Sequence, residues 1–256
     1  MVLGIERIKG FAIVSPVMAA CTYEALQNAT SNYVASRGSG QVDTLASPTV
    51  YTENYKTVDV KSGVLAKPLK IDNSRSTHDT TNCASYTELI ITDKAHPYVI
   101  GTQIHYTEDG KISKVDSIVT DQGDWLFNAT GTLYWAKQES WATIPEASRD
   151  TRETIQKAAD AYLDLFNNKN VVVPWGTPCA RLEGGSYTGK NSPTDSCNVG
   201  VPSGVPIVNR RYVIDETVGA VDAFVDFNGA NGIPDSHEFR IQAGKIRYVH
   251  TMSVTG

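Results

Sequence analysis

Apolar side chains recur at helical spacing in two segments of the chain. In residues 21–37 the recurring positions are Leu26, Ala29, Tyr33 and Val34, and Gly38-Ser-Gly40 ends the pattern. The second segment follows the capping sequence Asp150-Thr-Arg-Glu153, and its apolar positions are Ile155, Ala158, Tyr162, Leu163 and Phe166. This spacing gathers apolar side chains on one face, so it predicts two amphipathic helices.

Runs of alternating or apolar residues after each helix predict β-strands. The runs after the first helix occupy residues 83–92, 98–106 and 111–120, and those after the second occupy 207–216, 220–227, 237–242 and 245–254. Asp109-Gly110 predicts a tight hairpin turn. The polar stretch 44–80 shows no regular period, and we expect it to be irregular.

The two halves of the chain repeat the same landmarks in the same order. Gly110-Lys-Ile-Ser-Lys-Val115 returns as Gly244-Lys-Ile-Arg-Tyr-Val249, 134 residues later, and the helix motif around Tyr33 returns around Tyr162, 129 residues later. Nearly constant offsets predict a duplicated domain. We therefore expect an α+β protein in which each copy is one helix packed on a curved antiparallel sheet that encloses a cavity.

The landmarks also set the expected boundaries. We expect a signal peptide at 1–20, a first copy at 21–133, a linker at 134–148 and a second copy at 149–256. Three tryptophans, Trp125, Trp135 and Trp141, lie near the linker, and we expect them to pack the two copies together.

The first twenty residues have features of a secretory signal. Arg7 and Lys9 precede a mostly apolar stretch, and small residues follow before Cys21. An ordinary N-terminal strand is the alternative. The apolar stretch is shorter than the roughly 20 residues that a membrane-spanning helix needs, so we expect no membrane anchor.

The cysteines and two sequons also favour secretion. The chain has four cysteines, and Cys179 and Cys197 bracket a polar, glycine-rich loop that a disulfide would restrain. Cys21 would then pair with Cys83; four reduced thiols are the alternative, typical of a cytosolic protein. Asn28-Ala-Thr30 and Asn128-Ala-Thr130 are acceptor sequons for N-glycans, at Asn28 and Asn128.

Charge and motif spacing argue against several function classes. The net charge of −5 and the lack of a basic run argue against a nucleic-acid partner. The sequence Gly184-Gly-Ser-Tyr-Thr-Gly-Lys190 has the spacing of a phosphate loop but is followed by Asn191, and Pro193 stands where a helix should begin. The five histidines have no metal-site spacing, and no Gly-x-Ser-x-Gly elbow is present. We expect neither a metal nor a cofactor.

A cavity in the second copy is then the place to look for chemistry. Side chains two residues apart on a strand share a face. On this basis we consider five donors that could polarise a carbonyl or pass a proton: Arg210, Tyr212, His237, Arg240 and His250. His250 corresponds at the hairpin offset to Asp116, so the two copies differ there in an ionisable group. The alternatives without a catalytic role are that His250 is a surface histidine and that the arginines form ion pairs with carboxylates on a solvated face.

We also expect five residues to contact a substrate: Trp175, Arg181, Phe224, Tyr248 and Met252. Trp175 and Arg181 flank Cys179, so the disulfide loop could fold over the cavity mouth as a lid. Trp175 could equally be a core residue.

Several longer segments resemble a group of secreted fungal proteins of largely unassigned function. These are Val173-Pro-Trp-Gly-Thr-Pro-Cys-Ala-Arg-Leu-Glu-Gly184, Asp195-Ser-Cys-Asn-Val-Gly-Val-Pro-Ser-Gly204, Asn209-Arg-Arg-Tyr-Val-Ile-Asp-Glu216 and Pro234-Asp-Ser-His-Glu-Phe-Arg240. The order of helix and sheet also resembles the cone-shaped NTF2-like fold, which dehydratases, isomerases, polyketide cyclases and non-enzymatic binding domains share.

The chain is similar in type to secreted, glycosylated enzymes of fungal tropolone-sesquiterpenoid pathways. That resemblance implies a hetero-Diels-Alder reaction, in which the cavity holds a tropolone quinone methide beside a humulene-type alkene. Such a cyclase needs orientation and a hydrogen-bond donor but no cofactor. The alternatives are a secreted protein that binds an apolar small molecule without catalysis, and a dehydratase or isomerase. A homodimer through the open sheet face is a further expectation.

Overall fold

The computed structural model describes residues 21–256, and the predicted signal peptide at 1–20 lies outside the described residues. The first domain begins with a helix and continues into a six-stranded sheet. Its elements are α1 (Tyr23–Ser36), β1 (Leu45–Glu53), β2 (Lys56–Thr57), β3 (Asn73–Asp79), β4 (Ala84–Ile91), β5 (Tyr98–Tyr106) and β6 (Ile112–Thr120). A short 3-10 helix, η2 (Val64–Ala66), lies between β2 and β3.

The second domain repeats this order. Its elements are α3 (Arg152–Leu165), β7 (Trp175–Glu183), β8 (Ser186–Tyr187), β9 (Ile207–Asp215), β10 (Ala220–Phe227), β11 (Ile233–Gln242) and β12 (Lys245–Ser253). Helix α2 (Ala129–Ala136) and the 3-10 helix η3 (Glu146–Ser148) connect the two domains. The prediction of two tandem α+β domains is confirmed.

The two sheets have the same topology. Their strand orders are β2-β1-β6-β5-β4-β3 and β8-β7-β12-β11-β10-β9. The expectation of purely antiparallel sheets is wrong, because β1 pairs parallel with β6 and β7 pairs parallel with β12. These two parallel strands come from segments that lack a clear period, which is why the sequence pattern did not reveal them. The expectation of an irregular stretch at 44–80 is likewise wrong, because this stretch contains β1, β2 and β3.

Matching bulges fix how the two copies correspond. The β5–β6 ladder shifts register between His105 and Tyr106, and the β11–β12 ladder shifts between Arg240 and Ile241. When the two bulges are aligned, Ile100 on β5 corresponds to Asp235 on β11, and Val119 on β6 corresponds to Ser253 on β12. The other paired residues of the two ladders correspond in the same way. The two copies therefore share the β-bulge as well as the order of their elements.

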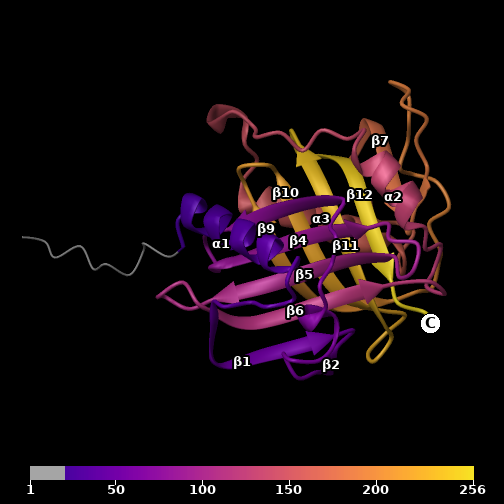
Figure 1. The fold of residues 1–256 in the computed structure, drawn as a ribbon. Coiled ribbons are helices and arrows are strands. Elements are labelled where there is room, and N and C mark those ends of the chain that lie inside the picture. The colour runs from indigo at the N-terminus through magenta and orange to yellow at the C-terminus, as the bar shows by residue number, and fades with distance from the viewer. Residues whose placement is uncertain (1–20) are drawn as a thin grey trace, which may run out of the picture.

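The two sheets pack face to face, and their strands cross steeply in the view of Figure 1. Helix α1 covers the outer face of the first sheet and α3 covers the outer face of the second. The core shared by the two sheets contains Ala84, Tyr86, Ile90, Val99 and Ile118 from the first domain and Leu182, Val213, Phe224 and Met252 from the second. Each sheet is thus buried on both faces.

The tryptophans near α2 contribute to this junction, as expected. Trp135 stacks on Tyr187, with ring centroids 4.3 Å apart. Trp141 lies over Arg75 of the first domain and beside Tyr248 of the second. Trp125 is the exception, because its side chain lines a cavity of the second domain.

Both predicted disulfides are present. Cys21–Cys83 joins the start of α1 to the start of β4, and Cys179–Cys197 joins β7 to the loop that precedes β9. Each closes a loop and so lowers the entropy of the unfolded chain. Among residues 21–256, no helix is both long and apolar enough to cross a membrane.

The two sequon asparagines are exposed. Asn128 caps α2, since its side-chain Oδ1 accepts a hydrogen bond from Gly131 N at 2.9 Å. Thr30 of the other sequon is buried within α1. Glycosylation at either site stays a prediction.

Phe224 tests the importance of the face-to-face packing. Its side chain is fully buried and meets Tyr86 of the opposite sheet edge-to-face. We expect Phe224→Ala to lower the free energy of unfolding by about 3–5 kcal/mol, measured by urea denaturation, because it leaves a cavity between the sheets. Tyr134→Ala, which truncates an aromatic side chain that is 57% exposed, should cost less than about 1 kcal/mol. Equal losses in the two variants would contradict the assignment of Phe224 to the core.

Candidate functional site

A cavity of about 360 Å³ lies in the second domain between α3 and the sheet face that this helix covers. Most of its wall is apolar or aromatic, and a few polar side chains enter from β7, β11 and β12. The lining residues are Trp125, Tyr162, Phe166, Arg181, Glu183, Gly200, Pro202, Phe227, Ile233, Asp235, His237, Thr251, Ser253 and Thr255. An apolar cavity with few polar groups is typical of a small-molecule site.

Asp235 and His237 are neighbouring inward positions on β11. Alternation along the strand turns both side chains to the same face, where Asp235 Oδ1 lies 3.5 Å from His237 Nδ1. Ser253 on β12 donates to Asp235 Oδ2 at 3.2 Å. Neither Asp235 Oδ1 nor His237 Nδ1 has a hydrogen-bond partner among the described residues, although both are buried. Buried polar atoms are normally paired, so two free ones in a cavity point to a ligand.

Burial sets the charge state of this pair. It holds the pKa of Asp235 well above its usual range, against the opposing hydrogen bond from Ser253. Burial, reinforced by the positive charges of Arg181 and Arg210, lowers the pKa of His237 to about 3. Burial therefore favours the protonated, uncharged form of Asp235 and the neutral form of His237. The pair can give one proton and accept another.

Aromatic rings hold His237 in place. Its ring is stacked on Phe239, with centroids 6.1 Å apart, and Tyr162 and Phe166 of the α3 region lie against it at 5.6 and 6.1 Å. Tyr162 is an inward position of α3 and is itself fully buried, which raises the pKa of its phenol. The base thus sits in a rigid, apolar setting.

Arg181 enters the cavity from β7 and is only 3% exposed. Its Nε lies 3.1 Å from Glu183 Oε1, its Nη1 lies 3.4 Å from Tyr162 OH, and its Nη2 donates to Val199 O. Burial raises the pKa of Glu183, although the charge of Arg181 opposes this. Arg181 is the cation of the cavity wall.

We expected the loop between Cys179 and Cys197 to cover the cavity mouth, but only Arg181 and Glu183 of β7 belong to the wall from this stretch. Gly200 and Pro202, which follow Cys197, are also wall residues. The Cys179–Cys197 bond ties the start of this following segment to β7, and Lys169 Nζ donates to Val201 O at 3.0 Å. The segment after Cys197 is therefore held at the cavity from two directions.

The first domain has no such chemistry at the equivalent positions. Ile100 stands where the second domain has Asp235, Thr102 where it has His237, and Val119 where it has Ser253. Ile100 belongs to the core beneath α1. The polar set is thus confined to the second copy, although both copies share one backbone plan.

Two of the ten predicted site residues, His237 and Arg181, line this cavity. Arg210 instead bonds Asp160 at 2.8 Å and Asp164 at 2.6 Å, both on α3, and Tyr212 also donates to Asp160. Arg210 and Tyr212 therefore attach α3 to β9.

The other predicted residues lie elsewhere. Phe224 and Met252 are in the core between the sheets, and Trp175 packs against Tyr162 without lining the cavity. Arg240 donates to Ala142 O at 2.8 Å, and Tyr248 packs against Trp141. Asp235, the partner that sequence reasoning missed, could have been found by comparing it with Ile100.

His250 belongs to a buried ionic cluster between the sheets. Its Nδ1 lies 2.8 Å from Glu88 Oε2 and its Nε2 lies 2.7 Å from Glu139 Oε2. Arg75, stacked 3.9 Å from the Trp141 ring centroid, pairs with Glu88 and Glu238. Burial alone would lower the pKa of His250, but Glu88 and Glu139 outweigh it and raise this pKa to about 10.

This cluster does not fit a metal site. Glu88, Glu238 and His250 bring possible ligand atoms within 4.8 Å of one another. Arg75, however, contacts both carboxylates, so its guanidinium already supplies the positive charge that a metal would supply. The cluster joins the two domains through buried ion pairs.

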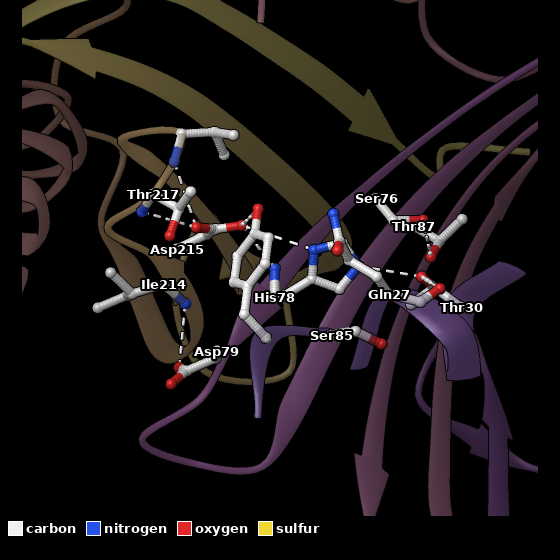
Figure 2. Close-up of polar contacts among 12 residues, drawn as sticks. Gln27, Thr30, Ser76, His78, Asp79, Ser85, Thr87, Ile214, Asp215 and Thr217 are labelled. Atoms are coloured by element: carbon white, nitrogen blue, oxygen red, sulfur yellow. Dashed lines mark hydrogen bonds and ion pairs between the residues drawn. The ribbon is translucent and has the colours of Figure 1, made fainter. Parts of the chain in front are cut away.

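A second junction, drawn in Figure 2, resembles a catalytic triad but lacks the required proton arrangement. His78 Nε2 lies 3.0 Å from Thr30 Oγ1, and His78 Nδ1 lies 3.7 Å from Asp215 Oδ2. Thr30 donates its hydroxyl proton to Gln27 O at 3.0 Å, so His78 Nε2 must donate to Thr30 rather than accept from it. His78 therefore cannot act as the base for Thr30.

The same junction explains what Asp215 and Asp79 do. Asp215 of the second domain accepts from Tyr23 OH at 3.1 Å and from His78 N at 2.9 Å, both in the first domain. Asp79 of the first domain receives both Nη groups of Arg152 at 2.8 and 2.6 Å. In each case a carboxylate of one domain accepts hydrogen bonds from the other domain, and these contacts join the two sheets at one edge.

A protein family described as "Domain of unknown function (DUF8021)" matches residues 148–253. The matched region is the second domain, with helix α3 and all the strands from β7 to β12. No curated protein matches the chain.

The pH dependence of stability tests the charge on His250. Because its folded pKa of about 10 exceeds the ordinary value of about 6.5, its contribution to stability is complete below pH ~6.5 and is lost as pH rises toward 10. We expect the free energy of unfolding to fall by roughly 3 kcal/mol between pH 6.5 and 9. Urea denaturation of His250→Gln should show a shallower fall, whereas the exposed substitution His96→Gln should keep the wild-type slope. An unchanged slope in His250→Gln would show that His250 is not the titrating group.

Proposed function

We propose that the second domain is a cofactor-independent enzyme that moves protons on one small, largely apolar molecule, as a dehydratase or isomerase does. The observation that carries this proposal is the Asp235–His237 pair: a carboxyl group and an imidazole, both buried, with free polar atoms in an apolar cavity where burial favours the uncharged form of each. General acid–base catalysis requires these two protonation states side by side.

A dehydration shows how the pair would work. His237 takes a proton from the carbon next to a carbonyl group, and the electron pair of that C–H bond forms a C=C bond. The C–O bond of a β-hydroxyl group breaks at the same time, and Asp235 gives its proton to the departing oxygen, which leaves as water. The imidazolium then returns its proton to the Asp235 carboxylate 3.5 Å away, which resets the pair.

An isomerisation uses the same groups with fewer bond changes. His237 removes a proton from one carbon while protonated Asp235 donates a hydrogen bond to the carbonyl oxygen that becomes negative. Return of the proton to a different carbon moves the double bond. The apolar wall excludes water and makes the hydrogen bond stronger than it would be in solution.

The cycloaddition implied by the sequence resemblance is our second candidate. Protonated Asp235 could polarise the carbonyl of a quinone methide, and the aromatic wall suits apolar partners. The cavity of about 360 Å³ lies near the lower end of the roughly 300–1,000 Å³ of small-molecule sites, which suits one ligand better than two. A single enantiomer formed from a tropolone quinone-methide precursor and humulene, resolved by chiral chromatography, would place this reaction first.

We also propose that each domain has the cone-shaped NTF2-like fold and that the protein works in an oxidising compartment. In both domains a helix lies over a mixed sheet, and in the second domain a cavity lies beneath the helix, which supports the first proposal. The two disulfides support secretion, because such bonds persist in the secretory pathway and outside the cell.

Deuterium exchange tests the proton transfer with simple ketones in place of the natural substrate. We expect the protein in D₂O to place deuterium on the carbon next to the carbonyl of some members of a panel of cyclic ketones and β-hydroxyketones, read by mass spectrometry. His237→Gln and Asp235→Asn should each slow this exchange by about 10²–10⁴-fold.

The matched controls are His96→Gln and Asp93→Asn, which make the same changes at exposed positions of the first domain. Both should keep the wild-type rate. Exchange that is equally fast in His237→Gln and wild type would remove the proposed base. Saturable binding with no exchange or product would favour a binding protein.

A further inference from the structure

We infer that the ligand of the second-domain cavity is a small apolar molecule with one anionic oxygen group, such as a monocarboxylate, and that Arg181 binds this group. The inference deepens the proposed function, because it concerns the same cavity and names the class of molecule that enters it. It rests on the cavity's charges, on the free donors of Arg181 and on the comparison with the first domain.

The charges of the wall favour one negative charge on the ligand. Among the wall residues in the described part of the chain, Arg181 is the one with a permanent positive charge. Burial favours the uncharged forms of both Asp235 and His237. Glu183 is the remaining wall carboxylate, and its raised pKa shows that burial disfavours its charge. A monoanion can therefore replace Glu183 as the partner of Arg181, whereas a cation would have to be buried against it.

The hydrogen bonds of Arg181 are incomplete. Its Nε is buried without a hydrogen bond, because Glu183 Oε1 lies 3.1 Å away but outside the direction of the N–H group. The contact from Nη1 to Tyr162 OH is 3.4 Å, longer than a normal hydrogen bond. A guanidinium has five N–H donors and binds a carboxylate through two of them at once. The two oxygens of a carboxylate would complete this set.

The first domain keeps the carboxylate position of this wall but has no cation beside it. Aligned ladders equate Tyr51 with Arg181 and Glu53 with Glu183. In the first domain Tyr51 OH donates to Glu53, and Glu53 also accepts from Val64 N. The carboxylate is thus kept in both copies, and in the first it accepts hydrogen bonds from Tyr51 and Val64. In the copy that has the acid–base pair, an arginine lies beside it.

The rest of the wall defines the body of the ligand. Phe166, Phe227, Ile233, Trp125 and Pro202 present apolar surface. Tyr162 connects this region to both functional groups, since its hydroxyl faces Arg181 and its ring lies against His237. An anion held by Arg181 therefore places an adjoining apolar ring next to the acid–base pair.

Three probes of one shape and different charge test the inference. They are 2-naphthoate, 2-naphthamide and 2-naphthylmethylammonium, titrated calorimetrically at pH 7 into the full-length, disulfide-bonded protein. We expect 2-naphthoate to bind at least about tenfold more tightly than the amide, which corresponds to about 1.4 kcal/mol, and the ammonium probe to show no measurable binding. Equal affinity for acid and amide, or no binding of any probe, would overturn the inference.

Substitutions assign the preference to Arg181. Arg181→Gln should abolish the preference for the acid, while Arg247→Gln, an arginine of β12 that donates to Pro178 O away from the cavity wall, should keep it. Circular dichroism checks that each variant is folded. Glu183→Gln removes the competing carboxylate and should tighten 2-naphthoate binding several-fold, so the inference remains testable if Arg181→Gln does not fold. Weaker binding in Glu183→Gln, or an intact preference in Arg181→Gln, would contradict it.

The two proposals fail separately. His237→Gln should lose deuterium exchange but keep the preference for 2-naphthoate, because its imidazole is neutral at pH 7. A protein that prefers the acid but exchanges no proton would be a carrier of apolar anions. A protein that exchanges protons but binds the amide equally well would keep the proposed reaction and lose the inferred substrate class.

Discussion

Burial of both faces of each sheet is the constraint on which the rest of this structure depends. One face lies beneath a helix and the other lies against the opposite sheet. Because side chains alternate along a strand, each strand contributes to two separate interiors. On β11, Asp235 and His237 reach the cavity beneath α3, while the next residue, Glu238, reaches the ionic cluster between the sheets. β11 thus supplies members of both sets of buried polar groups.

Buried ionisable groups are accommodated differently between the two sheets and beneath α3. Between the sheets, every carboxylate of the cluster is near a cation: Glu88 and Glu238 pair with Arg75, and Glu139 pairs with His250. Buried charges of this kind are tolerated because their partners offset the loss of hydration. Beneath α3, burial instead favours the uncharged forms of Asp235 and His237. The first solution fixes the position of two domains, and the second leaves groups that can still exchange protons.

The sequence predicted the parts of the fold that have a clear period. Both long helices, the hairpin at Gly110 and the two disulfides are where the pattern indicated. β1 and β7 escaped detection because parallel pairing needs no alternating pattern of its own, and β1 contains polar and exposed positions. The ionic cluster was also beyond reach, since its members come together only when two sheets cross.

The site was missed for a more specific reason. Comparing the copies at the hairpin offset drew attention to His250 and its counterpart Asp116, which face away from the helix. The turn between β11 and β12 is one residue shorter than the turn between β5 and β6, so β11 corresponds to β5 at an offset of 135, and the informative pair is Ile100 and Asp235. When two strands are aligned with an error of one residue, residues from opposite faces of the sheet are compared. His237 was nevertheless identified from alternation along its strand, and Arg181 was identified because it flanks Cys179.

Joining the two copies in one chain frees them from symmetry. In a dimer of identical subunits, any residue at the sheet-to-sheet interface occurs twice around a two-fold axis. Here Glu88 corresponds to Phe224, Glu238 to Gln103 and His250 to Asp116. Two copies of the full acidic cluster in one interface would double the number of buried carboxylates, whereas a single chain builds the cluster once and fills the mirrored place with a phenyl ring. Because the two copies are covalently linked, their sequences can differ at corresponding positions. One copy can therefore have buried polar groups that the other lacks, whereas a symmetric dimer would have to bury each of these groups twice.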